Sequence, residues 1–147
     1  MKTQDYQYII DRMPYGKDFL FIDKIISVDG THIKSEYHLP EHSVLYQGHF
    51  KDITVVPGVI LLEIMGQTGL VAQSIYLNKD EPNKTVLPLV SLINAEFHSI
   101  CFPNTKLIIN SEVIYFRHKV LKAKMGLYKS DDMSLIASST SSINVRN

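Results

Sequence analysis

Three groups that suit acid–base chemistry lie close together in the sequence, between positions 49 and 63. His49 lies in a loop that leads into a long apolar segment, and an imidazole titrates near neutral pH. Glu63 is the one charged residue of that segment, where burial would raise the pKa of its carboxyl group. Gly58 and Val59 open the segment, and the first N–H groups of a helix can donate hydrogen bonds to an oxyanion.

A base, an acid and oxyanion donors together suit the removal of a proton next to a carbonyl and the loss of a β-substituent. His49 would take the proton, the N–H of Gly58 or Val59 would hold the enolate-like oxygen, and Glu63 would protonate the departing hydroxyl. Each positioned proton transfer typically contributes about 10²–10⁴-fold in rate. The residue types therefore predict dehydration of a 3-hydroxyacyl compound. A packing histidine and a structural acid remain the alternative at this point.

The apolar segment that must position these groups runs from Val59 to Leu77 and follows Pro57. Proline favours the first turn of a helix, and nineteen residues give a helix of roughly 28 Å. A membrane span has nearly this length, but Glu63, Gln67 and Gln73 would be costly in hydrocarbon. We therefore expect a buried helix in a soluble protein and no membrane span.

Two glycines inside this helix, Gly66 and Gly69, cost about 1 kcal/mol each relative to alanine. Their benefit would be the close approach of another backbone. Gln67 lies one helical turn after Glu63, where its amide could hold the carboxyl group in place or contact a second subunit. Gln67 is therefore a supporting residue of the candidate site.

Segments rich in β-branched and aromatic residues surround the helix, and Asp29-Gly30 is a hairpin turn signal between the first two. The predicted strands are Phe19–Val28, His32–Leu39, Leu87–His98, Lys106–Arg117, Val120–Tyr128 and Leu135–Val145. A short helix is predicted over Asp5–Arg12, and the serine run 138–142 is predicted to be a solvated strand. The order predicts an α+β fold, in which a curved antiparallel sheet of five to six strands wraps one long buried helix.

The chain has 147 residues, which predicts a single domain over 1–147. Fifteen basic and fifteen acidic residues give a formal net charge of zero, which argues against a nucleic-acid partner. The single cysteine, Cys101, cannot form a disulfide within the chain and is expected to be buried. Together with an N-terminus that shows no signal pattern, this composition predicts a cytoplasmic protein.

The sequence resembles the hotdog-fold 3-hydroxyacyl-[acyl-carrier-protein] dehydratases in three neighbouring motifs. These are Gly48-His49-Phe50, then Pro57-Gly58-Val59, then Leu62-Glu63 followed by Gln67. Weaker similarity covers Met13–Asp23 and Ala95-Glu96-Phe97, so the resemblance spans most of the chain.

The resemblance implies a hotdog fold and assigns a role to each motif. His49 would remove the α-proton, Glu63 would protonate the β-hydroxyl, Gly58 would face the thioester carbonyl, and Phe50 would support the loop. It also implies an acyl carrier protein as partner and a homodimer whose sites combine His49 of one subunit with the acid of the other. No cofactor and no metal are expected.

Loops at the expected entrance depart from the family pattern, with Lys51 and Thr54 at positions that usually hold proline, and with Tyr15–Asp18 in place of a His-Arg-Tyr-Pro segment. We interpret the chain as a divergent member that serves fatty-acid synthesis or a related acyl or polyene pathway. A hotdog thioesterase and a non-catalytic acyl-binding subunit are the alternatives.

Two weaker signals complete the sequence-based hypotheses. Arg117-His118-Lys119, with Lys122 and Lys124, is a basic cluster that predicts a solvated hairpin or a docking site for an acidic carrier protein. His38 and His42 have a four-residue spacing, but Pro40 between them argues against a helix and a metal site.

Overall fold

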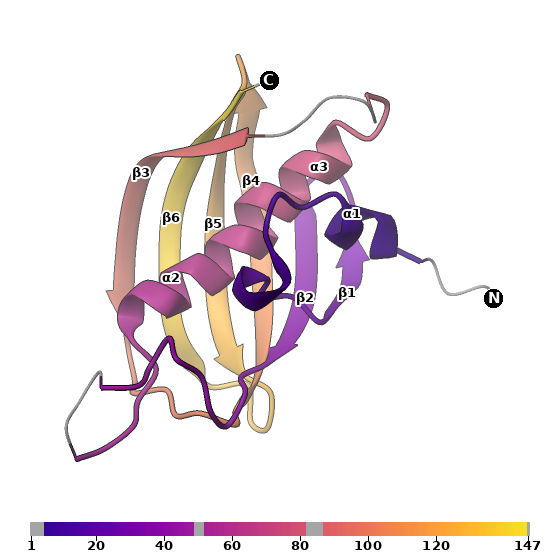
Figure 1. The fold of residues 1–147 in the computed structure, drawn as a ribbon. Coiled ribbons are helices and arrows are strands. Elements are labelled where there is room, and N and C mark those ends of the chain that lie inside the picture. The colour runs from indigo at the N-terminus through magenta and orange to yellow at the C-terminus, as the bar shows by residue number, and fades with distance from the viewer. Residues whose placement is uncertain (1–4, 49–51, 82–86, 147) are drawn as a thin grey trace.

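The computed structural model of the chain describes residues 5–48, 52–81 and 87–146. Six strands form one antiparallel sheet in the order β1-β2-β4-β5-β6-β3, and a long helix lies across its inner face (Figure 1). The strands are β1 Lys24–Val28, β2 His32–His38, β3 Leu87–Phe97, β4 Lys106–Arg117, β5 Val120–Lys129 and β6 Leu135–Arg146. The predicted α+β architecture with a curved antiparallel sheet around one helix is confirmed.

The long helix is continuous from Gly58 to Leu77 but changes its winding on the way. It consists of α2 (Gly58–Gly66), a π-helical segment (Gln67–Ala72) and α3 (Gln73–Leu77). This helix is long and apolar enough to cross a membrane, yet 67% of its apolar window is buried within the domain. The sheet covers most of this helix, which agrees with the prediction of a buried helix.

The core lies between this helix and the inner face of the sheet. Side chains that are completely inaccessible to solvent come from both layers: Ile64, Met65 and Ile75 from the helix, and Leu107, Ile109, Leu121 and Leu127 from β4 and β5. Cys101 is also buried, as predicted. Burial of apolar side chains contributes roughly 1.5–3 kcal/mol each, so this layer is the main source of stability.

The first strand is shorter than the sequence indicates, beginning at Lys24 instead of Phe19. Lys17–Phe19 forms a 3₁₀ turn, and the backbone of Phe19 and Phe21 bonds to a helix side chain in place of a neighbouring strand. The turn at Asp29-Gly30 is as predicted, because the Asp29 carboxylate accepts the N–H groups of Thr31 and His32. The predicted N-terminal helix is also shorter, spanning Gln7–Asp11 as α1.

The serine run 138–142 forms a strand, but the prediction that it is solvated is wrong. Ser139, Ser141 and Ser142 are each 4–5% exposed within β6. Ser139 and Ser141 lie opposite Met125 and Ala123 of β5, so they point to the inner face of the sheet. Composition could not reveal this, because polarity alone does not say which face of a strand is covered.

Gly69 brings the π-helical segment unusually close to the sheet. A Cβ atom at this position would lie 2.5 Å from the Met125 side chain and 2.6 Å from Ser111 Oγ. Next to it, the Thr68 hydroxyl makes a 2.6 Å hydrogen bond with Ser35 on β2. The close approach predicted for Gly69 is therefore found, but with side chains of the sheet and not with another backbone. The same prediction for Gly66 is wrong, since a Cβ there would meet only Leu70 at 3.9 Å.

We expect Gly69→Ala to lower the free energy of unfolding by about 1–3 kcal/mol, because the added methyl group overpacks this contact. Urea-induced unfolding followed by circular dichroism would measure the change. Gly66→Ala is the matched control, since its Cβ would meet only Leu70 at 3.9 Å. This variant should keep or raise stability, by up to about 1 kcal/mol, through higher helix propensity. Equal destabilisation by both substitutions would contradict the close-approach interpretation.

Candidate active site

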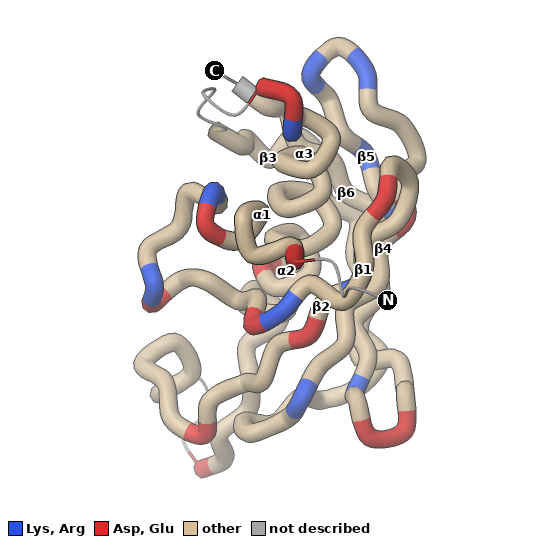
Figure 2. The backbone as a smooth tube through the Cα atoms, turned by 90° about the vertical axis from the view of Figure 1, so that its right-hand side faces the viewer, with Lys and Arg blue, Asp and Glu red and all other residues tan. Residues whose placement is uncertain are grey.

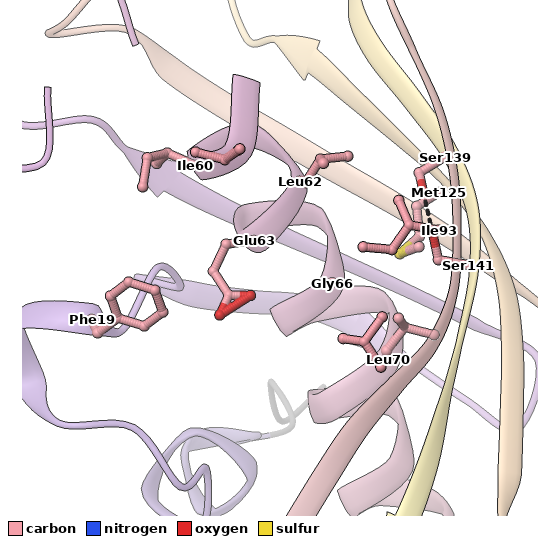
Figure 3. Close-up of a pocket in the computed structure, with 12 residues that line it drawn as sticks. Phe19, Ile60, Leu62, Glu63, Gly66, Leu70, Ile93, Met125, Ser139 and Ser141 are labelled. Atoms are coloured by element: carbon pink, nitrogen blue, oxygen red, sulfur yellow. Dashed lines mark hydrogen bonds between the residues drawn. The ribbon is translucent and has the colours of Figure 1, made fainter. Parts of the chain in front are cut away.

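Glu63 lies on α2 at the edge of a cavity of about 370 Å³ between the helix and the sheet (Figure 3). The helix contributes Val59, Glu63, Gly66 and Leu70 to its wall. The sheet contributes Val90 and Ile93 from β3, Met125 from β5, and Ser139 and Ser141 from β6. A single carboxyl group therefore faces a mostly apolar chamber that could hold an acyl chain.

The surroundings of Glu63 favour its neutral form. Burial beside the cavity raises the pKa of the Glu63 carboxyl group above its ordinary value, and a hydrogen bond with Gln67 opposes part of this rise. Tyr15 lies close enough to interact electrostatically with Glu63, and burial together with this carboxyl raises the pKa of the Tyr15 phenol to about 12. A carboxyl group that retains its proton is suited to donate it to a leaving group.

Gln67 connects Glu63 to the N-terminal segment of the chain. Its side chain is completely buried; its Oε1 accepts the N–H of Phe21 at 2.8 Å, and its Nε2 donates to the carbonyl of Phe19 at 2.8 Å. These two bonds fix which end of the amide carries the N–H groups. Nε2 has a second N–H, which can donate to the Glu63 carboxyl group one helical turn earlier. The carboxyl oxygen is then the acceptor of this bond.

The start of α2 is formed by Pro57, whose carbonyl accepts the N–H groups of Ile60 and Leu61. The N–H groups of Gly58 and Val59 therefore precede these bonds, at the positive end of the helix dipole. A Cβ at Gly58 would come within 3.2 Å of the Phe97 ring on β3, so a larger residue would disturb the helix start. The Val59 side chain is 71% exposed at the mouth of the cavity.

The predicted base, His49, and the supporting Phe50 lie outside the described residues. The chain on either side of them is positioned. Gly48 has a φ of 74°, a left-handed conformation that glycine adopts without strain. Beyond them, the N–H of Val56 donates to the carbonyl of Cys101 at 2.8 Å, which ties the approach to α2 to the segment after β3.

Sequence reasoning missed several residues that line the cavity. Phe19 sits opposite Glu63 at its rim, and Met125, Ser139 and Ser141 form its sheet side (Figure 3). Ser139 and Ser141 are hydrogen-bonded to one another through their hydroxyl groups. The available signal was the alternation along β6, because every second residue of a strand faces the same side. Which residues cover that face of the strand depends on where the helix crosses the sheet. No local sequence pattern specifies this crossing.

The other candidate groups have structural surroundings. His38 Nε2 hydrogen-bonds Asn104 at 2.8 Å, and burial raises the pKa of the Cys101 thiol to about 11, so it is a poor nucleophile. Within the described ranges, no group of three or more His, Cys, Asp or Glu side chains is arranged to hold a metal ion. His118 and Lys119 form the tight turn between β4 and β5, both with positive φ.

A family model described as a FabA-like domain matches residues 13–137 of the chain. The chain is 32% identical over 134 residues to the 3-hydroxyacyl-[acyl-carrier-protein] dehydratase FabZ of Lawsonia intracellularis, covering 89% of this chain and 85% of the relative. It is 30% identical over 125 residues to the FabZ dehydratase of Caldicellulosiruptor saccharolyticus, covering 84% and 87% of the two chains.

Solved structures agree on the fold. A chain of the dehydratase heterocomplex ApeI:P from Xenorhabdus doucetiae superposes with a TM-score of 0.78 at 14% identity, covering 94% of this chain and 91% of that one. Zebrafish thioesterase superfamily member 2 follows with a TM-score of 0.66 at 14% identity, covering 95% and 92%. The family model and the curated relatives carry the assignment: the chain belongs to the FabA-like family, among the hotdog-fold 3-hydroxyacyl-[acyl-carrier-protein] dehydratases.

Proposed function

We propose that this protein dehydrates a 3-hydroxyacyl thioester, carried by an acyl carrier protein, to the trans-2-enoyl thioester. The observation that carries the proposal is the Glu63 carboxyl group, which lies in the wall of an apolar cavity where burial raises its pKa. The FabZ relatives, which are named for this reaction, support the same assignment. The product would enter fatty-acid synthesis or a related acyl or polyene pathway.

In the proposed mechanism, the acyl chain lies in the cavity and the thioester carbonyl faces the N–H groups of Gly58 and Val59. His49 removes a proton from the α-carbon while these donors stabilise the negative charge that develops on the carbonyl oxygen. Glu63 then gives its proton to the β-hydroxyl, the carbon–oxygen bond breaks and water leaves. The proton on His49 returns to Glu63 through solvent, so the enzyme is unchanged after one turnover and needs no cofactor.

We expect His49→Ala and Glu63→Gln each to lower kcat for dehydration by about 10²–10⁴-fold, because each removes one positioned proton transfer. The enoyl absorbance formed from a 3-hydroxyacyl thioester would measure the rate. Glu112→Gln is the matched control, since Glu112 is an exposed carboxylate on the outer face of β4. Full activity of either site variant would contradict the mechanism.

The thioesterase alternative has the same fold but a different product. A thioesterase releases a free thiol, whereas a dehydratase leaves the thioester intact, so a thiol-trapping reagent in the same assay separates them. The non-catalytic alternative predicts binding of an acyl ligand with neither product. A carboxyl group with a raised pKa in the cavity favours dehydration, because a leaving hydroxyl needs a proton whereas a thiolate can leave without one.

Gln67 gives the reaction a predictable pH dependence. Glu63 must be protonated to act as the acid, so the rate falls as the pH rises through its pKa. The hydrogen bond with Gln67 lowers this pKa, against the larger rise caused by burial. Removing that hydrogen bond would therefore raise the pKa of Glu63 and extend activity to higher pH.

We expect Gln67→Met to move the alkaline limb of the kcat profile to higher pH while lowering the maximum rate, because the carboxyl is less well oriented. The measurement is kcat between pH 5 and 10, with thermal melting at each pH to separate unfolding from titration. Gln73→Met is the matched control, since the Gln73 amide is also buried but bonds to the carbonyl of Asp29. An unchanged or lowered alkaline limb in Gln67→Met would refute this role.

We infer that a second copy of the chain covers the free edge of β3. β3 ends the sheet, and six of its large apolar side chains are 45–64% exposed: Leu87, Leu89, Val90, Leu92, Ile93 and Phe97. A long apolar edge strand is prone to aggregate unless something covers it. Antiparallel pairing with the same strand of a second copy satisfies the backbone groups and buries these side chains.

Such a pairing would also complete the active site. Gly58 packs beside Phe97 at one end of β3, whereas the cavity beside Glu63 is lined by Val90 and Ile93 nearer the other end. Two antiparallel copies of the strand place the helix start of one subunit next to the cavity of its partner. We infer from the family resemblance that His49 of one subunit would then meet Glu63 of the other.

We expect Leu92→Lys to convert the homodimer to monomers and to abolish dehydration, because the two new charges would meet near the centre of the paired strands. Sedimentation velocity would measure the assembly. Ile114→Lys is the matched control, since Ile114 is similarly exposed on β4, away from the edge.

A mixture of the inactive His49→Ala and Glu63→Gln subunits should regain roughly a quarter of wild-type activity after exchange of subunits. Half of the dimers then contain one subunit of each kind, and one of the two sites in such a dimer is intact. No recovery in mixed dimers would argue against shared sites.

The basic hairpin between β4 and β5 provides a surface for an acidic carrier protein in the cytoplasm. Arg117, His118 and Lys119 are exposed at its tip, and Lys124 is exposed on β5. Figure 2 shows basic segments of the backbone gathered in the hairpin beside β5. His118 and Lys119 both have positive φ values, as the two central residues of a tight two-residue hairpin turn do. The hairpin lies at the end of the sheet away from Gly58 of its own chain (Figure 1), so antiparallel pairing brings it towards the partner's site.

A further inference from the structure

The helix wall of the cavity has a gap at Gly66 that packing does not explain. A Cβ atom there would meet only Leu70, at an ordinary contact distance of 3.9 Å, whereas at Gly69 it would collide with the sheet. Glycine inside a helix costs stability relative to alanine. Gly66 lines the cavity one turn after Glu63, so its missing side chain widens the chamber where the chain passes the acid.

The sheet wall opposite Gly66 is formed by short hydroxyl side chains and a thioether. Ser139 and Ser141 are 5% and 4% exposed, and both line the cavity beside Met125 (Figure 3). Two hydroxyl groups carry two hydrogens, and the single bond between them uses one. The second hydrogen makes no hydrogen bond among those of the described residues, so the pair can donate it to a ligand in the cavity.

The rim of the cavity is aromatic. Phe19 lies across from Glu63, and its ring is 4.9 Å from the ring of Phe21 and 6.1 Å from that of Tyr15. Aromatic rings stack favourably on flat π systems, and a methionine sulfur makes favourable contacts with aromatic rings. Aliphatic residues such as Leu62 and Ile93 contact any acyl chain, whereas Phe19 and Met125 can make additional favourable contacts with a planar unsaturated group.

We propose that this cavity is adapted to an acyl chain that carries a planar unsaturated group, aromatic or conjugated, beside Gly66, and that Gly66 is the specificity-determining residue. This inference rests on the proposed function, because it assigns the substrate class of the same site. The width comes from the missing side chain, and the preference for an unsaturated group comes from Phe19, Met125 and the free hydroxyl hydrogen of the serine pair.

The test uses three pantetheine-linked acyl amides with equal numbers of carbon atoms: 5-phenylpentanoyl, 5-cyclohexylpentanoyl and undecanoyl. Calorimetric titration of the full-length protein measures the affinity for each. We expect the wild-type protein to bind the phenyl ligand about tenfold more tightly than the other two. Gly66→Ala should remove most of this preference, because a single added carbon in a fitted pocket changes affinity by about tenfold or more.

The double substitution Ser139→Ala and Ser141→Ala tests the contribution of the hydroxyl groups separately from the width of the cavity. It should reduce the preference for phenyl over cyclohexyl while keeping that for phenyl over the straight chain. Gly30→Ala, in the β1–β2 turn where a Cβ meets nothing within 4 Å, is the control and should change neither. Equal affinity of the wild-type protein for all three ligands, or an unchanged preference in Gly66→Ala, would overturn the proposal.

The amide ligands cannot be dehydrated, so this test is independent of turnover. A protein that shows the phenyl preference but dehydrates no 3-hydroxyacyl thioester would refute the proposed function and leave the cavity assignment standing. A protein that dehydrates straight chains without the preference would refute the cavity assignment alone.

Discussion

The buried amide of Gln67 is the constraint on which the rest of the site depends. It replaces strand pairing for Phe19 and Phe21, and through these bonds it holds the N-terminal segment against the helix. That segment places Phe19 at the rim of the cavity and Tyr15 near Glu63. One side chain therefore contributes to the polarity around Glu63, holds one side of the chamber in place and delays the start of the first strand to Lys24.

The two glycines of the helix have different roles: one allows close packing, and the other gives room in the cavity. Gly69 is required by packing, because the sheet occupies the space that a side chain would need. Gly66 faces open space, so its effect is on the cavity and not on the contact with the sheet. Three residues apart on a helix, the same residue type serves close packing in one place and room for a ligand in the other.

Much of the architecture could be predicted from the sequence, because local patterns determine it. The apolar run after Pro57, the turn at Asp29-Gly30 and the β-branched segments gave the helix and the order of the strands. The start of β1 could not be predicted, since a hydrogen bond to Gln67, 46 residues away from Phe21, decides it. Motif spacing predicted Glu63 and Gln67 as site residues, but the lining of the cavity by Met125, Ser139 and Ser141 depends on how the helix crosses the sheet.

The exposed apolar edge of β3 connects the proposed assembly of two chains with the proposed dehydration reaction. A single copy leaves this strand uncovered and the cavity open along Val90 and Ile93. Covering the edge with a second copy would remove water from that side, which strengthens the hydrogen bonds and charge interactions around Glu63. The proposed base and acid would then come together only in the assembled dimer.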